Sequence, residues 1–189
     1  MDKKEVRKQI RSIRDAMGET ERLCLSERIT DTLLALPEYI ESEYVLVYVS
    51  FGSEVDTRDI ILDALKNNKK VGVPRIDAGD MNFYEINGFE ELIPGFYGIY
   101  EPDASHKKPC EPESALMILP GLAFDRKMFR AGYGGGYYDR YFSVHSGKKY
   151  LKYALAFDCQ VLKKGFISCE PNDVPVDCII TEFDVIRSL

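Results

Sequence analysis

The sequence LPGLAFDRKMFRAGYGGGYYDRY, residues 119–141, decides how the chain is interpreted, because it joins an apolar strand to a helix through a glycine-rich turn. Gly132, Gly134, Gly135 and Gly136 fall within five positions. Such a cluster costs chain entropy and packs no side chains, so it predicts that something approaches the backbone closely. Backbone N–H groups in a glycine turn, aimed with a helix N-terminus, form a concave site for anions.

Charged residues on both sides of the glycines indicate which anion would bind. Arg130 precedes them with a fork of N–H donors that suits phosphate oxygens. Asp139 follows in the first turn of a predicted helix, 137–146, and suits a divalent cation. These residues favour a site for a magnesium-bound polyphosphate. A plain surface loop is the alternative, since the stretch matches neither Gly-x-x-x-x-Gly-Lys-Ser/Thr nor Gly-x-Gly-x-x-Gly.

Strands and helices alternate along the rest of the chain. Apolar, β-rich runs predict strands at 44–49, 70–74, 81–86, 116–119 and 150–157, and a last core strand that begins near 177. Apolar spacing predicts helices at 3–17, at 20–36 and from 56 or 57 to 67. Strand–helix–strand units of this length are right-handed and parallel. We therefore predict an α/β fold, with a single domain over residues 1–189 and a mostly parallel sheet between helix layers.

The N-terminal helix is basic on most of its surface. Its apolar stripe consists of Val6, Ile10, Ile13 and Met17. Its cations are Lys3, Lys4, Arg7, Lys8, Arg11 and Arg14. Most of them are expected to form a solvated helix face. Lys3 and Arg7 are four residues apart on one face and can reach one anion together.

Composition limits the possible functions. The 189 residues carry 31 acidic and 25 basic side chains, and this net charge of −6 argues against broad nucleic-acid or anionic-membrane binding. No run approaches the roughly 18 apolar residues of a membrane span, and the first residues contain no apolar signal region. The five cysteines form no Cys-x-x-Cys pair, so we expect reduced, mostly buried thiols in a cytoplasmic protein.

Several other positions have more than one interpretation. Glu54 follows the strand 44–49 at its carboxyl end, where open α/β sheets bind ligands, but it also suits a surface loop or a helix cap. Arg75 ends the next strand and can contact an anion or only solvent. Residues 91–114 are rich in Pro, Gly and charge, which predicts a long irregular connection. His106 and His145 have no companion nucleophile or ligand at a recognisable spacing, and we expect both to be non-catalytic.

The string Phe-Asp-x-x-x-x-Arg-x-Gly-Tyr-Gly-Gly-Gly-Tyr-Tyr-Asp-Arg, residues 124–140, resembles the signature of the 5-formyltetrahydrofolate cyclo-ligases, also called methenyltetrahydrofolate synthetases. Other blocks resemble that family in the same order: Lys-x-x-x-Arg at 3–7, Ser-x-x-x-Glu-x-x-Thr at 50–57, Gly-Ile-x-Glu-Pro at 98–102 and the segment 174–182. The family usually has glycine where Met128 stands and leucine where Ala131 stands.

The resemblance implies a fold of the NagB/RpiA-like kind. It also implies an ATP- and Mg²⁺-dependent conversion of 5-formyltetrahydrofolate to 5,10-methenyltetrahydrofolate, in which phosphorylation of the formyl oxygen precedes ring closure and ADP and phosphate are released. The implied ATP-binding residues are Lys3, Arg7, Arg130, Ala131, Gly132, Tyr133, Gly134, Gly135, Gly136, Tyr137 and Tyr138. The implied folate-binding residues are Val49, Glu54, Tyr133, Gly134, Gly135, Gly136 and Tyr137. The implied Mg²⁺ ligands are Asp139 and Asp177, although Asp177 also suits a strand cap.

The implied partners are small molecules, a reduced folate and ATP, with no nucleic acid and no membrane, and we expect a monomer. Two other classes stay open because fold does not fix function. An isomerase or transferase could use the glycine turn for a sugar phosphate or an acyl carrier, and it would be active without ATP or Mg²⁺. A catalytically silent relative would bind ATP or folate without consuming ATP.

Overall fold

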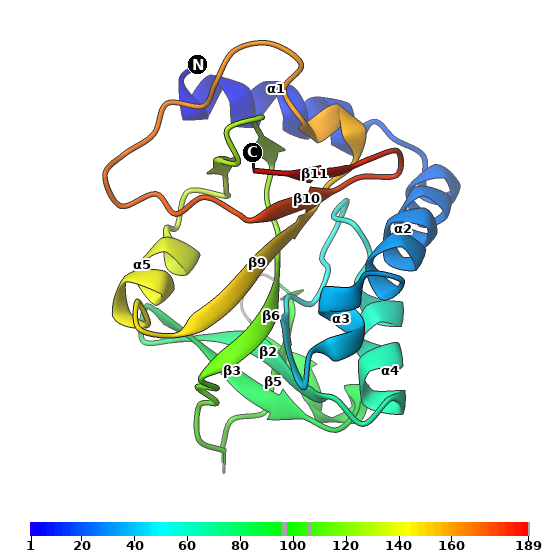
Figure 1. The fold of residues 1–189 in the computed structure, drawn as a ribbon, viewed down its shortest axis with the longest axis vertical. Helices are drawn as coiled ribbons and strands as arrows, with labels where there is room; N and C mark the ends of the chain where they lie inside the picture. Colours follow the sequence, from blue (N-terminus) through cyan, green and yellow to red (C-terminus); the bar gives the residue numbers. More distant parts are fainter. Residues whose placement is uncertain (96–97, 106, 189) are drawn as a thin grey trace.

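A single seven-stranded sheet forms the centre of the molecule (Figure 1). The computed structural model describes residues 1–95, 98–105 and 107–188. The strands of the sheet are β1 (Tyr44–Val47), β2 (Lys70–Asp77), β3 (Asp80–Ile86), β6 (Ser114–Leu119), β9 (Lys149–Leu155), β10 (Cys178–Ile180) and β11 (Val185–Arg187). Their order is β11–β10–β9–β6–β1–β2–β3. The inner strands pair in parallel, whereas β3 and β11 are antiparallel edges. This confirms the predicted mostly parallel α/β sheet.

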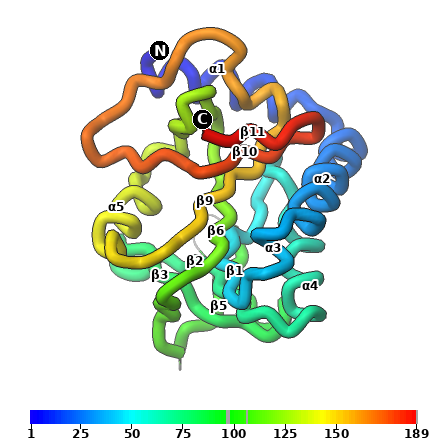
Figure 2. Tube along the Cα trace, viewed as in Figure 1, coloured from blue at the N-terminus to red at the C-terminus, as the bar shows by residue number. Residues whose placement is uncertain are grey.

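Helices cover both faces of the sheet. They are α1 (Lys3–Asp15), α2 (Glu19–Leu34), α3 (Pro37–Glu41), α4 (Arg58–Lys66) and α5 (Tyr137–Val144). Helices α2, α3 and α4 lie on one side and α5 on the other, while α1 crosses the end at which the parallel strands finish (Figures 1 and 2). None of these described helices is long and apolar enough to span a membrane.

Burial on both faces explains why β1 is apolar throughout. Val45 and Val47 pack in the core beneath α2, α3 and α4. Tyr44 and Leu46, which alternate with them, pack in the second core with residues of α5. A strand whose two sets of side chains are both buried cannot alternate with polar residues, and this is typical of inner parallel strands.

The expected bounds differ from the structure in a few places. Pro37 is predicted only to end the helix before it. In the structure it begins α3, at a helix position where a missing N–H costs nothing. Within the expected irregular connection, β4 (Leu92–Pro94) pairs with β5 (Tyr100–Pro102). The edge strand β11 was not expected. His106 lies outside the described residues.

The cysteines are less buried than the sequence suggested. Cys178 on β10 is buried, whereas Cys24 and Cys169 are exposed and Cys110 and Cys159 are partly exposed. The expectation of mostly buried thiols is therefore wrong, because Cys24 lies on the outer surface of α2 and Cys169 in the long segment before β10. All five are free thiols, as expected.

Candidate functional site

The connections out of the sheet diverge between β1 and β6. From β1 the chain passes through α4 to β2 on one side, whereas β6, β9 and β10 are added on the other side. Loops that leave the carboxyl ends of two such strands separate and form the crevice in which open α/β sheets bind ligands. The loop after β1 contains Glu54, and the segment after β6 leads to the glycine turn. Both predicted regions therefore lie at the carboxyl ends of β1 and β6, and we call the place where they meet the crevice.

A small hairpin precedes the glycine turn and holds it in place. It consists of β7 (Ala123–Phe124) and β8 (Arg130–Ala131). The apolar face of α1 packs against this hairpin, with Val6 and Ile10 in one cluster with Ala123, Ala131 and Ile167. The N-terminal helix thereby brings its cations to the glycine turn.

Asp125 organises the turn of this hairpin. Its carboxylate is fully buried and accepts hydrogen bonds from the N–H groups of Lys127 at 2.9 Å, Phe129 at 3.0 Å and Ile167 at 2.8 Å. Met128 in the same turn has a φ of +69°, in the left-handed region that favours glycine. The turn geometry therefore suits the glycine that the resemblance implies at this position.

Replacement of Asp125 by alanine should lower the free energy of unfolding by about 3 kcal/mol or more, since each N–H donor left without an acceptor costs about 1–3 kcal/mol. The melting temperature should fall by roughly 6 °C or more for a domain of this size. Thermal unfolding followed by circular dichroism measures this. Asp125→Asn keeps one acceptor oxygen, so its melting temperature should lie between those of Asp125→Ala and the unchanged protein. An unchanged melting temperature in Asp125→Ala would contradict the role of Asp125 in the turn.

The glycine turn is open. Gly134 and Gly136 have φ values of +106° and +65°, which require glycine for backbone reasons. Gly132 differs in that its φ is not in the left-handed region, and a Cβ built at Gly132 or at Gly134 meets no atom within 4 Å. At Gly135 the ring of Tyr137 would be 2.5 Å from such a Cβ. The space beside Gly132 and Gly134 is thus not filled by the described side chains.

Helix α5 begins directly after the glycine turn. Gly136 is its N-cap and supplies no side chain to accept from the first turn. The N–H groups of Tyr137, Tyr138 and Asp139 find no acceptor among the residues that the structure describes. Free donors at a helix N-terminus favour an anion.

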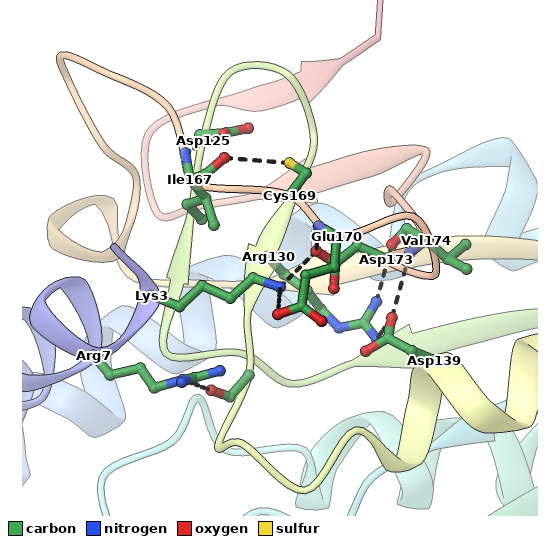
Figure 3. Close-up of polar contacts among 11 residues, drawn as sticks. Lys3, Arg7, Asp125, Arg130, Asp139, Ile167, Cys169, Glu170, Asp173 and Val174 are labelled. Atoms are coloured by element: carbon green, nitrogen blue, oxygen red, sulfur yellow. Dashed lines mark hydrogen bonds and ion pairs between the residues drawn. The ribbon is translucent and has the colours of Figure 1, made fainter. Parts of the chain in front are cut away.

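Arg130 is buried beside the turn, with 7% of its surface exposed. Its Nη2 lies 2.8 Å from Oδ1 of Asp139, and its Nη1 donates to the carbonyl of Val174 at 3.2 Å (Figure 3). The guanidinium also lies 5.7 Å from the ring centroid of Tyr138 and 5.8 Å from that of Phe142. These contacts fix the orientation of its donor fork.

Lys3 and Arg7 both reach this side of the molecule from α1. Nζ of Lys3 is 2.5 Å from Asp173 and 3.9 Å from Glu170 (Figure 3). Nε of Arg7 donates to the carbonyl of Gly132 at 2.6 Å. Burial would raise the pKa of Asp173, but the hydrogen bond from the Glu170 N–H and the contact with Lys3 lower it below the ordinary value. The carboxylate of Asp173 therefore stays charged. The two cations therefore hold the glycine turn and the segment before β10 together.

Asp139 and Asp177 each have one occupied oxygen. Oδ1 of Asp139 accepts from Arg130 and, at 3.3 Å, from the N–H of Val174. Oδ2 of Asp177 accepts from the N–H of Lys152 at 2.8 Å and lies 3.0 Å from its Nζ. The second oxygen of each carboxylate accepts no hydrogen bond from the described part of the chain. No group of three or more metal-ligating side chains occurs among those residues.

Glu54 is connected to the glycine turn directly. The hydroxyl of Tyr133 donates to its Oε1, and the N–H of Phe51 donates to its Oε2 at 2.9 Å. Burial raises the pKa of Glu54, although the Tyr133 hydroxyl, the Phe51 N–H and the charge of Arg14 oppose this. Val49 lies partly buried just after β1 and packs against the core. The structure therefore brings the two predicted folate-binding regions into contact.

The structure also identifies a buried cation that the sequence analysis missed. Arg14 was assigned to the solvated face of α1 and Ile13 to its apolar stripe. In the structure Arg14 is 4% exposed and Ile13 is 51% exposed. Val6, Ile10 and Arg14 follow one another at intervals of four, so they share a helix face. That spacing is the signal which could have identified Arg14.

Arg75 and His145 make contacts of their own. Nε of Arg75 lies 2.8 Å from Asp77, and its Nη1 donates to the carbonyl of Pro102 at 2.8 Å, which links β2 to β5. The ring of His145 stacks on Tyr141 with 4.0 Å between centroids. These contacts explain both side chains without a ligand.

The sheet order and the place of the two loops are those of the open α/β class, whose members bind ligands where the strand order reverses. The chain belongs to the 5-formyltetrahydrofolate cyclo-ligase family, whose model matches residues 1–182.

Relatives with known structures have the same fold. A 5,10-methenyltetrahydrofolate synthetase from Aquifex aeolicus is 33% identical and superposes with a TM-score of 0.84, covering 98% of this chain and 92% of that chain. A second one, from Mycoplasma pneumoniae, is 25% identical with a TM-score of 0.76 and coverages of 96% and 99%. The mitochondrial 5-formyltetrahydrofolate cyclo-ligase of Arabidopsis thaliana is 32% identical over 97% of this chain and 75% of its own length.

Proposed function

We propose that this enzyme couples the conversion of 5-formyltetrahydrofolate to 5,10-methenyltetrahydrofolate to the hydrolysis of ATP, in the presence of Mg²⁺. The observation that carries this proposal is the open glycine turn beside buried Arg130, followed directly by the free N–H groups of α5. Such a cradle suits a polyphosphate. Membership of the cyclo-ligase family supplies the folate reaction.

The chemistry explains why ATP is needed. An amide oxygen is a poor leaving group, so transfer of the γ-phosphoryl group to the formyl oxygen activates the formyl carbon. N10 then attacks that carbon and loses its proton, the ring closes, and phosphate leaves with the former formyl oxygen. Phosphoryl transfer depends on positioning and charge stabilisation more than on covalent catalysis. Arg130 and the turn from Ala131 to Tyr138 would hold the triphosphate, with Lys3 and Arg7 beside them.

The two aspartates fit a magnesium ion that arrives with the nucleotide. Mg²⁺ commonly takes one or two carboxylates together with phosphate oxygens and water. Asp139 and Asp177 each have one carboxylate oxygen free of described hydrogen-bond donors, and they would hold the ion. When bound, Mg²⁺ neutralises phosphate charge. The lack of a third metal-ligating side chain among the described residues is consistent with an ion that binds weakly without ATP.

Glu54 can receive the folate without giving up its present contacts. An ionised carboxylate has about four acceptor positions. The Tyr133 hydroxyl and the Phe51 N–H use one on each oxygen. The pterin ring presents N–H donors in pairs, which suit the remaining positions, while Val49 and the turn from Tyr133 to Tyr137 line the same space. All proposed groups come from one chain, so a monomer suffices.

The affinity for folate should depend on pH through Glu54. Its pKa is raised above the ordinary value of 4.5 by burial, so it takes up a proton at a higher pH than an exposed glutamate. The KM for 5-formyltetrahydrofolate should therefore rise as the pH falls through this raised pKa. Steady-state kinetics between pH 4.5 and 8 measure this. In Glu54→Gln the KM should be high at every pH, and an unchanged pH profile in that variant would contradict the assignment.

An absorbance assay for methenyltetrahydrofolate tests the whole proposal, with ATP and Mg²⁺ omitted in turn. Product should form only when both are present, with one ADP released for each product molecule. Turnover of a sugar phosphate or acyl substrate without ATP would instead support an isomerase or transferase. Binding of ATP without its consumption would support a silent relative.

A further inference from the structure

Arg14 joins the two loops of the crevice. Its Nη1 donates to the hydroxyl of Tyr133 at 3.1 Å, and its Nε donates to Oγ of Ser53 at 3.0 Å. Tyr133 belongs to the glycine turn after β6, and Ser53 to the loop after β1. One side chain from α1 therefore contacts both walls of the crevice and is almost fully buried there.

This burial needs a physical reason. A buried guanidinium is costly unless its charge is compensated. Among the described residues, no carboxylate lies within ion-pair distance of Arg14. Its charge is instead compensated through two hydroxyl groups: that of Tyr133 donates to Glu54, and that of Ser53 donates to Asp15.

The direction of each hydrogen bond in this chain of contacts is fixed. A guanidinium can only donate, so the Tyr133 oxygen must accept from Arg14. The single hydroxyl proton of Tyr133 is then free to point at Glu54, which must accept. The contacts with Arg14 thus orient the donor that holds one oxygen of Glu54.

We propose that Arg14 is a positioning residue for the folate, which acts by holding Tyr133 and, through it, Glu54 in the crevice. This inference rests on the proposed role of Glu54. Arg14 does not touch the folate itself in this proposal. It sets the position of the carboxylate that receives the pterin N–H groups, and it has no role in holding ATP.

The electrostatic surroundings of Glu54 agree with this role. Burial, and next the charge of Glu54, raise the pKa of Tyr48 just after β1, of Tyr133 in the turn and of Tyr138 in α5. Arg14 is the cation that acts on Glu54, and its charge lowers the pKa of Glu54 against the effect of burial. Loss of Arg14 would leave the carboxylate among neutral groups and favour its protonated form.

Kinetics of Arg14→Leu, Tyr133→Phe and the double variant test the proposal, with Arg28→Leu as the matched control. Arg14 lies 5.9 Å from the ring centroid of Tyr133, and Arg28 on α2 lies 5.4 Å from that of Phe183. In Arg14→Leu the KM for 5-formyltetrahydrofolate should rise about tenfold or more, the usual size of a lost hydrogen bond to a charged group, with the KM for ATP within about twofold. The double variant should be no worse than Arg14→Leu, because both changes break the same connection.

Three outcomes overturn the proposal: an unchanged folate KM in Arg14→Leu, additive effects in the double variant, or an equal rise in the KM for ATP. If Arg14→Leu does not fold, Tyr133→Phe decides by the same shift in folate KM, since it removes only a hydroxyl from a ring that is 45% exposed. Glu54→Gln separates the two proposals. A normal folate KM in Glu54→Gln refutes the proposed contact of Glu54 with folate. If the folate KM is raised in Glu54→Gln but normal in Arg14→Leu, only the positioning role of Arg14 is refuted.

Discussion

Replacement of Arg130 by alanine should lower kcat about 100-fold or more, as the loss of one electrostatic group at a reacting centre commonly does. Arg130 is buried, and its guanidinium is fixed by Asp139, Val174 and the rings of Tyr138 and Phe142. A donor fork that is already oriented stabilises charge on a transferring phosphoryl group without further reorganisation. Initial rates at saturating ATP, folate and Mg²⁺ measure the effect.

Arg126 provides the matched control for this variant. It lies in the same hairpin but is exposed, so Arg126→Ala should keep the normal kcat. Arg130→Lys keeps the charge and loses the fork, and its rate should lie between those of Arg130→Ala and the unchanged enzyme. A near-normal kcat in a folded Arg130→Ala enzyme would refute the assignment of Arg130 to the triphosphate.

Replacement of Asp139 by asparagine should also reduce kcat about 100-fold, and it should raise the Mg²⁺ concentration for half-maximal rate about tenfold or more. The asparagine oxygen can still accept from Arg130 and from the N–H of Val174. The change therefore removes mainly the negative charge that would hold the metal. Magnesium titrations at fixed ATP give both numbers.

Asp177→Asn should shift the magnesium dependence in the same direction, because the second carboxylate would share the same ion. The contacts of Asp177 with Lys152 lie at the start of β10, so its loss should leave Arg130 in place. If Asp139→Asn lowered kcat at an unchanged magnesium requirement, Asp139 would act only by orienting Arg130, and the metal assignment would be wrong.

The sequence could predict the sheet because the residue pattern of each strand indicates which of its faces are buried. The run from Tyr44 to Val47 is apolar on both sets of alternating positions, which favours an inner strand wherever its partners lie. The sequence could also predict the turn at Gly134 and Gly136, since their positive φ values favour glycine. Met128 shows the limit of this inference, because its φ is also in the left-handed region although a methionine does not indicate this in the sequence.

Arg14 marks where prediction from the sequence failed. Six cations on one helix differ little in local sequence, and periodicity alone placed Ile13 inside and Arg14 outside. The side that is buried depends on the hairpin β7–β8 and the loop after β1, which pack against α1 from far along the chain. Only that packing supplies Ser53 and Tyr133 as partners for the guanidinium.

By itself the sequence determined the inner strands of the sheet, most of the apolar core positions and the glycines of the turn, because these follow from interactions within a few residues. The tertiary structure alone decided that β1 and β6 are neighbours and that their loops meet at one crevice. There the hydroxyl of Tyr133 donates a hydrogen bond to Glu54 and accepts one from Arg14. The pairing of β1 with β6 joins residues about 70 positions apart, such as Val45 and Leu116, and no local pattern carries that information.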